Sequence, residues 1–142
     1  AAATWDPGRG RVALIVETRP TPWLVVAIRN ALDVLGTPWG DDRVHGWNLC
    51  VAGDDATLAY VRPRVAGDYL ELPLPGKLDN AAAFSALLLD ESFWARLRPT
   101  GNHVLVFQTD CALLRPPRRD DLRWGIVGAL CGAIDGREGH SC

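Results

Sequence analysis

The sequence predicts an α/β fold, a Rossmann-like three-layer sandwich in which helices cover both faces of a mainly parallel sheet. The main observation is the order of the elements. Four short apolar runs alternate along the chain with segments of helical periodicity, in the order β-α-β-α-β-α-β. A second observation is that charged or polar residues directly follow three of these runs. In open α/β sheets, ligands bind outside the carboxyl ends of the strands, so these residues form the candidate site.

The first strand and the first helix are predicted from the beginning of the chain. Residues 11–17 read RVALIVE, a continuous aliphatic run typical of a strand that is buried on both faces. Pro22 suits the first turn of a helix, and Thr21 before it is of a residue type that caps helix N-termini. Apolar residues then recur at helical spacing until Gly36, which ends the helix.

The second and third strands are predicted to be shorter. Residues 47–53 (WNLCVAG) form an apolar run, after which two aspartates open a short helix over residues 55–61. Residues 69–74 (YLELPL) are predicted as a third strand that contains Pro73. Because proline cannot donate a ladder hydrogen bond, this strand belongs at an edge of the sheet, or Pro73 lies at the strand end.

One long helix is predicted over residues 80–97 (NAAAFSALLLDESFWARL), with Asp79 as its N-cap. Phe93 and Trp94 close this helix and are expected to pack it onto the sheet near the start of the fourth strand. That strand is predicted over residues 103–110 (HVLVFQTD).

The predicted sheet has residues 11–17 at its centre. Residues 47–52 and 103–107 are expected as its parallel neighbours, because the most uniformly aliphatic runs need cover on both faces. After residue 115 the chain is polar and rich in proline until WGIVGAL, at residues 124–130, offers a last apolar segment.

Composition indicates a soluble globular domain whose net charge does not favour binding to a charged partner. The chain has 142 residues, of which 48% are hydrophobic and 23% charged, and this balance differs from that of disordered chains. A net charge of −2 gives no electrostatic argument for binding nucleic acid or an anionic membrane. No apolar run approaches the roughly 18 residues that indicate a membrane-spanning helix.

The cysteines and the first residue leave the compartment open. Cys50 and Cys111 lie in or beside core-like runs, where a free thiol behaves as a small hydrophobe, whereas Cys131 and Cys142 lie in a glycine-rich tail and could pair. The sequence has no methionine, so Ala1 is not an initiator and we expect an upstream part to be missing. A secretory or endomembrane location fits this observation and the even number of cysteines.

Several common motifs are absent from the sequence. No GxGxxG follows the first strand, and no GxxxxGK[ST] follows any strand, which argues against a dinucleotide fingerprint and a P-loop. A GxSxG nucleophile elbow and a CxxC dithiol are also missing. The candidate site therefore rests on the residues at the strand ends.

Polar residues follow three of the four predicted strands. They are Glu17, Thr18 and Arg19 after the first, Asp54 and Asp55 after the second, and Gln108, Thr109 and Asp110 after the fourth. Two interpretations of Asp110 remain open. A carboxylate that ends a buried strand projects into the crevice and can serve a ligand. Alternatively, Asp110 is a turn former whose carboxylate accepts the backbone N–H of Ala112 or Leu113. Glu17 and Arg19 could likewise be no more than a solvated ion pair.

One block of the sequence resembles a known family. Residues 87–115, LLLDESFWARLRPTGNHVLVFQTDCALLR, are similar to the signature of an uncharacterised, glycosyltransferase-like family of domains of unknown function. Its members have a helix ending in Phe-Trp, a short loop and a strand that reads like vLifQtDs. VALIVETRP, at residues 12–20, resembles the first strand of the family with its Glu-x-Arg end. The resemblance covers about residues 11–130, and residues 131–142 form a tail outside it.

The resemblance implies the nucleotide-sugar-binding half of a GT-A glycosyltransferase. In such enzymes an acidic motif at the end of the fourth strand holds Mn²⁺ or Mg²⁺ against the donor diphosphate and stabilises the leaving group. Asp110 is then the metal ligand, and Gln108 and Thr109 stand where another carboxylate is common. The residues implied to contact the donor are Glu17, Thr18, Arg19, Asp54 and Gln108.

Two functions follow from the resemblance. The first is a metal-dependent glycosyltransferase, or the donor half of one. The second is a non-catalytic, glycosyltransferase-like module within a larger assembly, whose surfaces contact protein partners. Full transferases of this type continue past the metal motif with segments that bind the acceptor and supply the base. The stretch after residue 130 does not resemble this continuation, so no catalytic base can be named.

Overall fold

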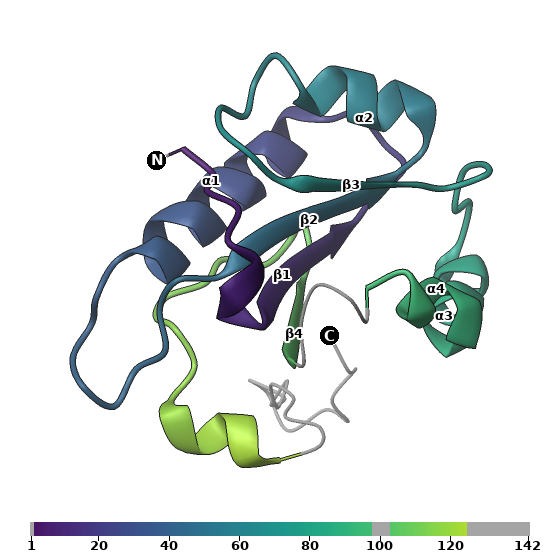
Figure 1. Ribbon diagram of the computed structural model, residues 1–142. Coiled ribbons are helices and arrows are strands. Elements are labelled where there is room, and N and C mark those ends of the chain that lie inside the picture. Colours follow the sequence, from purple (N-terminus) through teal and green to yellow (C-terminus); the bar gives the residue numbers. More distant parts are fainter. Residues whose placement is uncertain (1, 98–102, 125–142) are drawn as a thin grey trace, which may run out of the picture.

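Four parallel strands form the centre of the structure, in the order β3-β2-β1-β4 (Figure 1). The computed structural model describes residues 2–97 and 103–124. The strands are β1 (Arg11–Val16), β2 (Asn48–Gly53), β3 (Leu70–Pro73) and β4 (His103–Phe107). As predicted, β1 is central and pairs in parallel with both β2 and β4, so that Ala13 lies between Leu49 and Leu105. The third strand lies at one edge of the sheet and ends at Pro73, as its sequence indicated.

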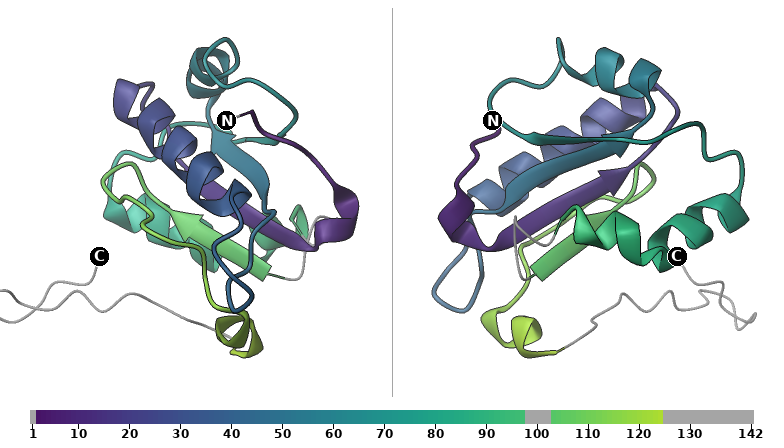
Figure 2. Two further views of the ribbon diagram at one scale, coloured as in Figure 1. Left: turned by 90° about the vertical axis from the view of Figure 1, so that its left-hand side faces the viewer. Right: turned by 45° about the vertical axis from the view of Figure 1, so that its right-hand side comes forward.

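Helices cover both faces of this sheet, which confirms the predicted Rossmann-like α/β sandwich (Figures 1 and 2). Helices α1 (Pro22–Gly36) and α2 (Asp55–Val61) lie on one face, and α3 (Ala81–Leu89) and α4 (Glu91–Ala95) lie on the other. The described residues also form two short 3₁₀ helices, η1 (Pro7–Arg9) before β1 and η3 (Arg119–Arg123) after β4. None of the helices within the described ranges has the length and apolar character needed to cross a bilayer.

The first face of the sheet is closed by a continuous apolar core. Side chains alternate along a strand, so every second residue of β1 and β2 points to α1 and α2. Helix α1 buries a stripe at helical spacing against these strands, and each large aliphatic side chain buried in this way contributes roughly 1.5–3 kcal/mol. The strand residues and the α1 stripe in this core include Ala13, Ile15, Leu49, Val51, Leu24, Ile28 and Leu35.

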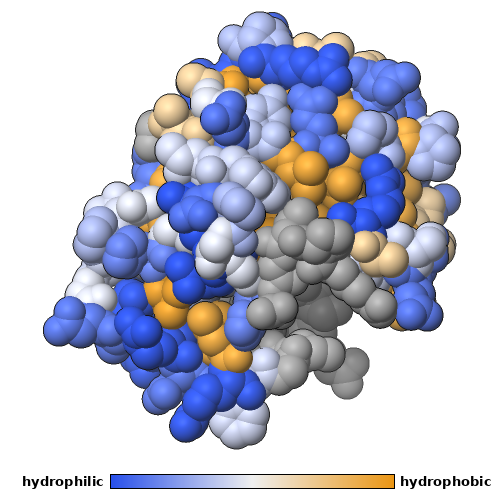
Figure 3. All heavy atoms as spheres, viewed as in Figure 1, coloured by the Kyte–Doolittle hydropathy of each residue, from blue (hydrophilic) through white to orange (hydrophobic). Residues whose placement is uncertain are grey.

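The second face of the sheet is covered less completely. Val12, Leu14 and Cys50 point to α3 and α4, yet none of the residues of α3 is buried. In the space-filling view, apolar side chains reach the surface in the middle of the molecule (Figure 3). Burial raises the pKa of the Cys50 thiol to about 12, so Cys50 stays neutral and packs as a small apolar group, as expected.

The expectation of one long helix over residues 80–97 is wrong, because the helix is interrupted at Asp90. The backbone of Asp90 is extended, with φ −80° and ψ 113°, and its carboxylate accepts the N–H and the hydroxyl of Ser92 at 2.9 and 2.8 Å. Asp and Ser compete with helical hydrogen bonding in this way, so Asp90 ends α3 and caps α4. The N-cap of α3 is Asn80 rather than Asp79, since Asn80 Oδ1 accepts the N–H of Ala83.

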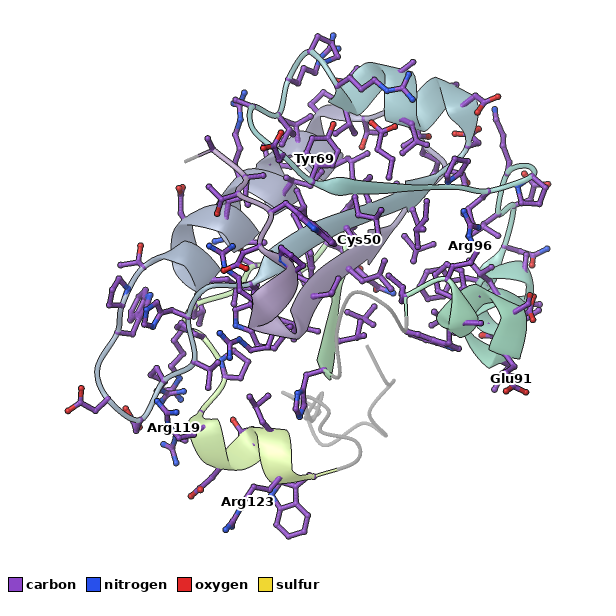
Figure 4. All side chains as sticks on the ribbon, in the orientation of Figure 1. Cys50, Tyr69, Glu91, Arg96, Arg119 and Arg123 are labelled. Atoms are coloured by element: carbon purple, nitrogen blue, oxygen red, sulfur yellow. The ribbon has the colours of Figure 1, made fainter. Side chains whose placement is uncertain are left out.

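Phe93 and Trp94 pack the two short helices against the sheet. Phe93 is 2% exposed and belongs to the core of the second face, and Val104 of β4 packs against that core. Trp94 is half-buried, lies edge-on to Phe93 at 5.3 Å between ring centroids, and donates its indole N–H to Leu88 O at 2.7 Å. At the end of α4, Arg96 Nη1 donates to Pro73 O at 3.0 Å (Figure 4). The aromatic pair therefore packs where the sequence predicted, with Phe93 as the buried member.

Some sequence-based expectations concern residues that the structure does not describe. Residues 125–130 of the last apolar segment lie outside the described ranges, as does the tail 131–142 with Cys131 and Cys142. Within those ranges, Cys50 and Cys111 are both free thiols. Cys50 is buried as expected, but Cys111 is exposed because it lies in the turn after β4 rather than in the core.

Replacing Phe93 with alanine tests the packing of the second face. Truncating a buried aromatic removes apolar contacts and leaves a cavity, so Phe93→Ala should lower the free energy of unfolding by about 3–5 kcal/mol. Leu89→Ala is the matched control, because Leu89 is 86% exposed and should change stability by at most about 0.5 kcal/mol. Urea denaturation followed by circular dichroism measures both, and equal effects of the two substitutions would contradict this packing.

Candidate functional site

The sheet topology creates a crevice between β1 and β4. The chain proceeds from β1 to β2 and β3 on one side, and β4 then returns to the other side of β1. The helices that follow β1 and precede β4 therefore lie on opposite faces, and the carboxyl ends of these two strands are left open between them. A cleft of about 540 Å³ lies at this point, and we call it the switch-point cleft. The residues after β1 and β4 that line it are Glu17, Thr18, Arg19, Gln108, Thr109 and Asp110.

Glu17 organises the loop that follows β1. Its side chain is 10% exposed, and Oε1 accepts the backbone N–H groups of Thr18 and Arg19, both at 2.9 Å. The guanidinium of Arg19 adds two further bonds of 2.9 Å, from Nε to Oε1 and from Nη2 to Oε2. Burial alone raises the pKa of Glu17, but these hydrogen bonds and the charge of Arg19 outweigh it, so the pKa is lowered. The carboxylate is thus ionised and fully engaged within the protein.

Arg19 is the cation that this loop presents to the cleft. Its side chain is 73% exposed, and the hydrogen bond and charge of Glu17 raise its pKa. The two bonds to Glu17 use two of the five N–H donors of the guanidinium and leave the other three for a ligand. The ion pair is therefore more than a solvated pair, because its buried carboxylate holds the exposed guanidinium in one orientation.

Thr18 joins the cleft to the segment before α3. Its side chain is 2% exposed, and Oγ1 accepts the backbone N–H of Leu78 at 2.9 Å. This bond holds the start of α3 against the end of β1, and Asn80 and Phe84 line the cleft from that side. Thr18 therefore builds the wall of the cleft.

The structure contradicts the turn-former interpretation of Asp110 at Leu113. The N–H of Leu113 bonds Asn30 Oδ1 at 2.7 Å instead, and the turn after β4 is closed by Cys111 N–H and Gln108 O at 3.3 Å. The carboxylate of Asp110 is exposed at the cleft and accepts a long contact of 3.6 Å from the Cys111 thiol. Its oxygens are therefore accessible to a ligand.

Asp54 lies outside the lining of the switch-point cleft. Its carboxylate caps α2 by accepting the N–H of Thr57 at 3.0 Å, and hydrogen bonding by Thr57 lowers the pKa of Asp54. The strand ends thus bring together the candidate residues after β1 and β4, whereas the candidate after β2 has a capping role.

The sequence analysis did not single out Gly53, which lets β2 approach the end of β1, or Asn80 at the start of α3, which lines the cleft. A Cβ on Gly53 would lie 2.7 Å from the backbone oxygen of Glu17, so only glycine allows β2 to end this close to β1. A glycine that ends a strand is a recognisable sign of close backbone approach. The Asn80 side chain before an alanine run was a comparable sign of an N-cap.

The described residues do not form a metal site by themselves. No group of three His, Cys, Asp or Glu side chains that could hold a metal ion occurs among them. Asp110 stands beside an amide and a hydroxyl, Gln108 and Thr109, while the carboxylate of Glu17 is engaged by Arg19. Asp79 is a further carboxylate in the lining of the cleft. Mg²⁺ and Mn²⁺ prefer several oxygen ligands, and Asp79 and Asp110 belong to no group of three potential ligands among the described residues, so they do not provide a preformed centre.

The fold and the cleft together define an α/β sandwich with an open cleft at its topological switch point. Comparisons of the chain with protein-family models, curated proteins and solved structures found no match. The functional assignment therefore depends on the chemistry of the cleft.

The lowered pKa of Glu17 makes the stability of the loop depend on pH. The ionised carboxylate stabilises the fold above its unfolded-state pKa, and this contribution is lost as the pH falls through the lowered folded-state pKa. Glu17→Gln should therefore lower the free energy of unfolding by about 1–2 kcal/mol at neutral pH. Urea denaturation should show the difference shrinking between about pH 5 and pH 3. A difference of constant size over this range would mean that the charge of Glu17 does not hold the loop.

Proposed function

We propose that the switch-point cleft binds a nucleotide sugar, and that the chain is a glycosyltransferase-like donor-binding domain. The observation that carries the proposal is the guanidinium of Arg19, which the buried Glu17 orients at the cleft next to Asp110. This arrangement stands at the edge of the sheet where α/β folds bind their ligands.

The chemistry of the cleft suits a ligand with a diphosphate and a sugar. Guanidinium groups bind phosphate oxygens through paired N–H donors, and three donors of Arg19 remain for this purpose. The amides of Gln108 and Asn80 and the hydroxyl of Thr109 can bind the hydroxyl groups of a sugar. A cleft of about 540 Å³ lies within the usual range of roughly 300–1,000 Å³ for small-molecule sites.

Asp110 has a different part in this proposal. A carboxylate and a phosphate repel each other, so Asp110 does not bind the diphosphate directly. It accepts a sugar hydroxyl, or it shares Mn²⁺ or Mg²⁺ with phosphate oxygens that complete the coordination. Binding of the nucleotide sugar through Arg19 does not depend on which of these holds.

The family resemblance supports the same proposal. Two of its strand ends, the Glu-x-Arg after the first strand and the Gln-Thr-Asp after the fourth, are far apart in the sequence but line one cleft. Polar residues from distant segments that line one cleft can bind the same ligand, whereas polar residues at separate strand ends cannot.

A second candidate function is a non-catalytic module that binds protein partners, as the sequence also suggested. The apolar helix α3 favours it, because this helix has no buried residue and Leu89 is 86% exposed. Within the described residues, β4 pairs only with β1, which leaves its other edge without a strand partner.

Titration with UDP-glucose and UDP, with and without Mn²⁺, tests the proposed function. Native protein should bind both, and Arg19→Ala should weaken binding at least roughly tenfold, since a charge-assisted bond is worth about 1.5–3 kcal/mol. Arg62→Ala is the matched control, because Arg62 is an exposed arginine that forms a bidentate ion pair with Glu71 away from the cleft.

Asp110→Asn separates the two parts proposed for that carboxylate. A loss of affinity that requires Mn²⁺ indicates the shared metal, and a loss confined to UDP-glucose indicates the sugar hydroxyl. The proposal fails if native protein binds neither ligand, or if Arg19→Ala and Arg62→Ala bind as tightly as native protein. In that case the partner-binding module becomes the better assignment.

A further inference from the structure

A second pocket lies on the α1 side of the same strand ends, and we call it the α1-side pocket. Its volume is about 500 Å³, and it shares Arg19, Thr109 and Asp110 with the switch-point cleft. The two hollows therefore meet at a common wall that carries the guanidinium and the carboxylate. Trp23 and Val26 of α1 form much of its remaining lining.

The α1-side pocket exposes apolar surface that the core of the protein does not use. Trp23, Val26 and Asn30 are spaced three and four residues apart and form one stripe of α1, beside the stripe that packs on the sheet. Trp23 is 68% exposed and Val26 is 53% exposed. An indole that lines a pocket and is this accessible can stack with a flat ligand.

The walls of this pocket are held in place by a two-way hydrogen bond. Asn30 Nδ2 donates to Leu113 O at 3.0 Å, and Asn30 Oδ1 accepts Leu113 N–H at 2.7 Å. This pair fastens the segment after β4 along α1, and Figure 2 (left) shows the two running side by side. Cys111 and Ala112 of that segment thereby line the same pocket as Trp23. The pocket is therefore formed before any ligand binds, which reduces the cost of binding.

We propose that the α1-side pocket holds the nucleobase of the ligand, stacked on the indole of Trp23. The inference rests on the proposed function, since it assumes that the diphosphate lies at Arg19. A ligand anchored there extends into both hollows, because Arg19 belongs to both. The cleft on the α3 side offers amides and hydroxyls that suit a sugar. The α1 side offers an indole and aliphatic groups, which suit a flat heteroaromatic ring.

Two probes distinguish this inference from the function on which it rests. UDP carries both the base and the phosphates, whereas inorganic pyrophosphate carries the phosphates alone. Trp23→Ala should weaken the binding of UDP roughly tenfold, the usual effect of removing one stacking platform, and should leave pyrophosphate unchanged. Trp23→Phe should retain most of the affinity for UDP because a ring remains. Trp124→Ala is the matched control, since Trp124 is 65% exposed and does not line the pocket: it follows η3, which contacts His103 at the amino end of β4, whereas the pocket lies at the carboxyl ends of the strands.

Isothermal titration calorimetry with both probes, on variants whose thermal melting matches that of native protein, decides the outcome. The inference is overturned if native protein binds UDP no more tightly than pyrophosphate, or if Trp23→Ala weakens both probes equally. In either case the loss of both probes in Arg19→Ala would still support the proposed function. If native protein binds neither probe, the inference and the proposed function both fail.

Discussion

The buried carboxylate of Glu17 is the interaction on which the candidate site depends. It stands at the end of the central strand and collects bonds from two backbone N–H groups and from the guanidinium of Arg19. A carboxylate that is removed from water needs such partners, because burial otherwise favours its neutral form. The same bonds turn the chain away from the sheet and fix the direction of Arg19. One local network thereby ends β1, starts the path to α1 and aims a cation at the cleft.

The backbone of Glu17 lies close to the end of β2, and this contact joins the Glu17 network to the neighbouring segments. The N–H of Glu17 donates to Ala52 O at 2.9 Å, and Gly53 leaves room for the backbone oxygen of Glu17. Thr18 extends the contact to Leu78 on the opposite face of the sheet. The ends of β1 and β2 are therefore positioned relative to one another by backbone groups, and the segment before α3 is held to them by the buried hydroxyl of Thr18. A ligand in the cleft meets walls whose arrangement depends little on exposed side chains.

The sequence predicted the sheet well because parallel strands buried on both faces are continuously apolar. That signal located β1 and β2, which are buried along almost their whole length, whereas β3 and β4 are only partly buried and were located as shorter apolar runs. Pro73 located an edge of the sheet. The sequence could not show the break at Asp90, because Asp and Ser also occur on the exposed side of a continuous helix. They act as the cap of a second helix only where the backbone leaves the helical conformation. Nor could the sequence separate Asp54 from Asp110. Both follow strands, and only the strand order shows that one caps a helix while the other faces the crevice.

The unequal cover of the two faces has a consequence for how the protein opens. Helix α1 buries a full stripe against the sheet, whereas α3 buries no residue and α4 only Phe93. Local unfolding costs least where few apolar contacts are lost, so amide hydrogens of α3 and α4 exchange with solvent sooner than those of β1 and β2. The start of α3 also lines the switch-point cleft. A molecule bound in the cleft therefore slows the exchange of the amide hydrogens of α3. Hydrogen exchange in this weakly protected helix thus shows whether the cleft is occupied.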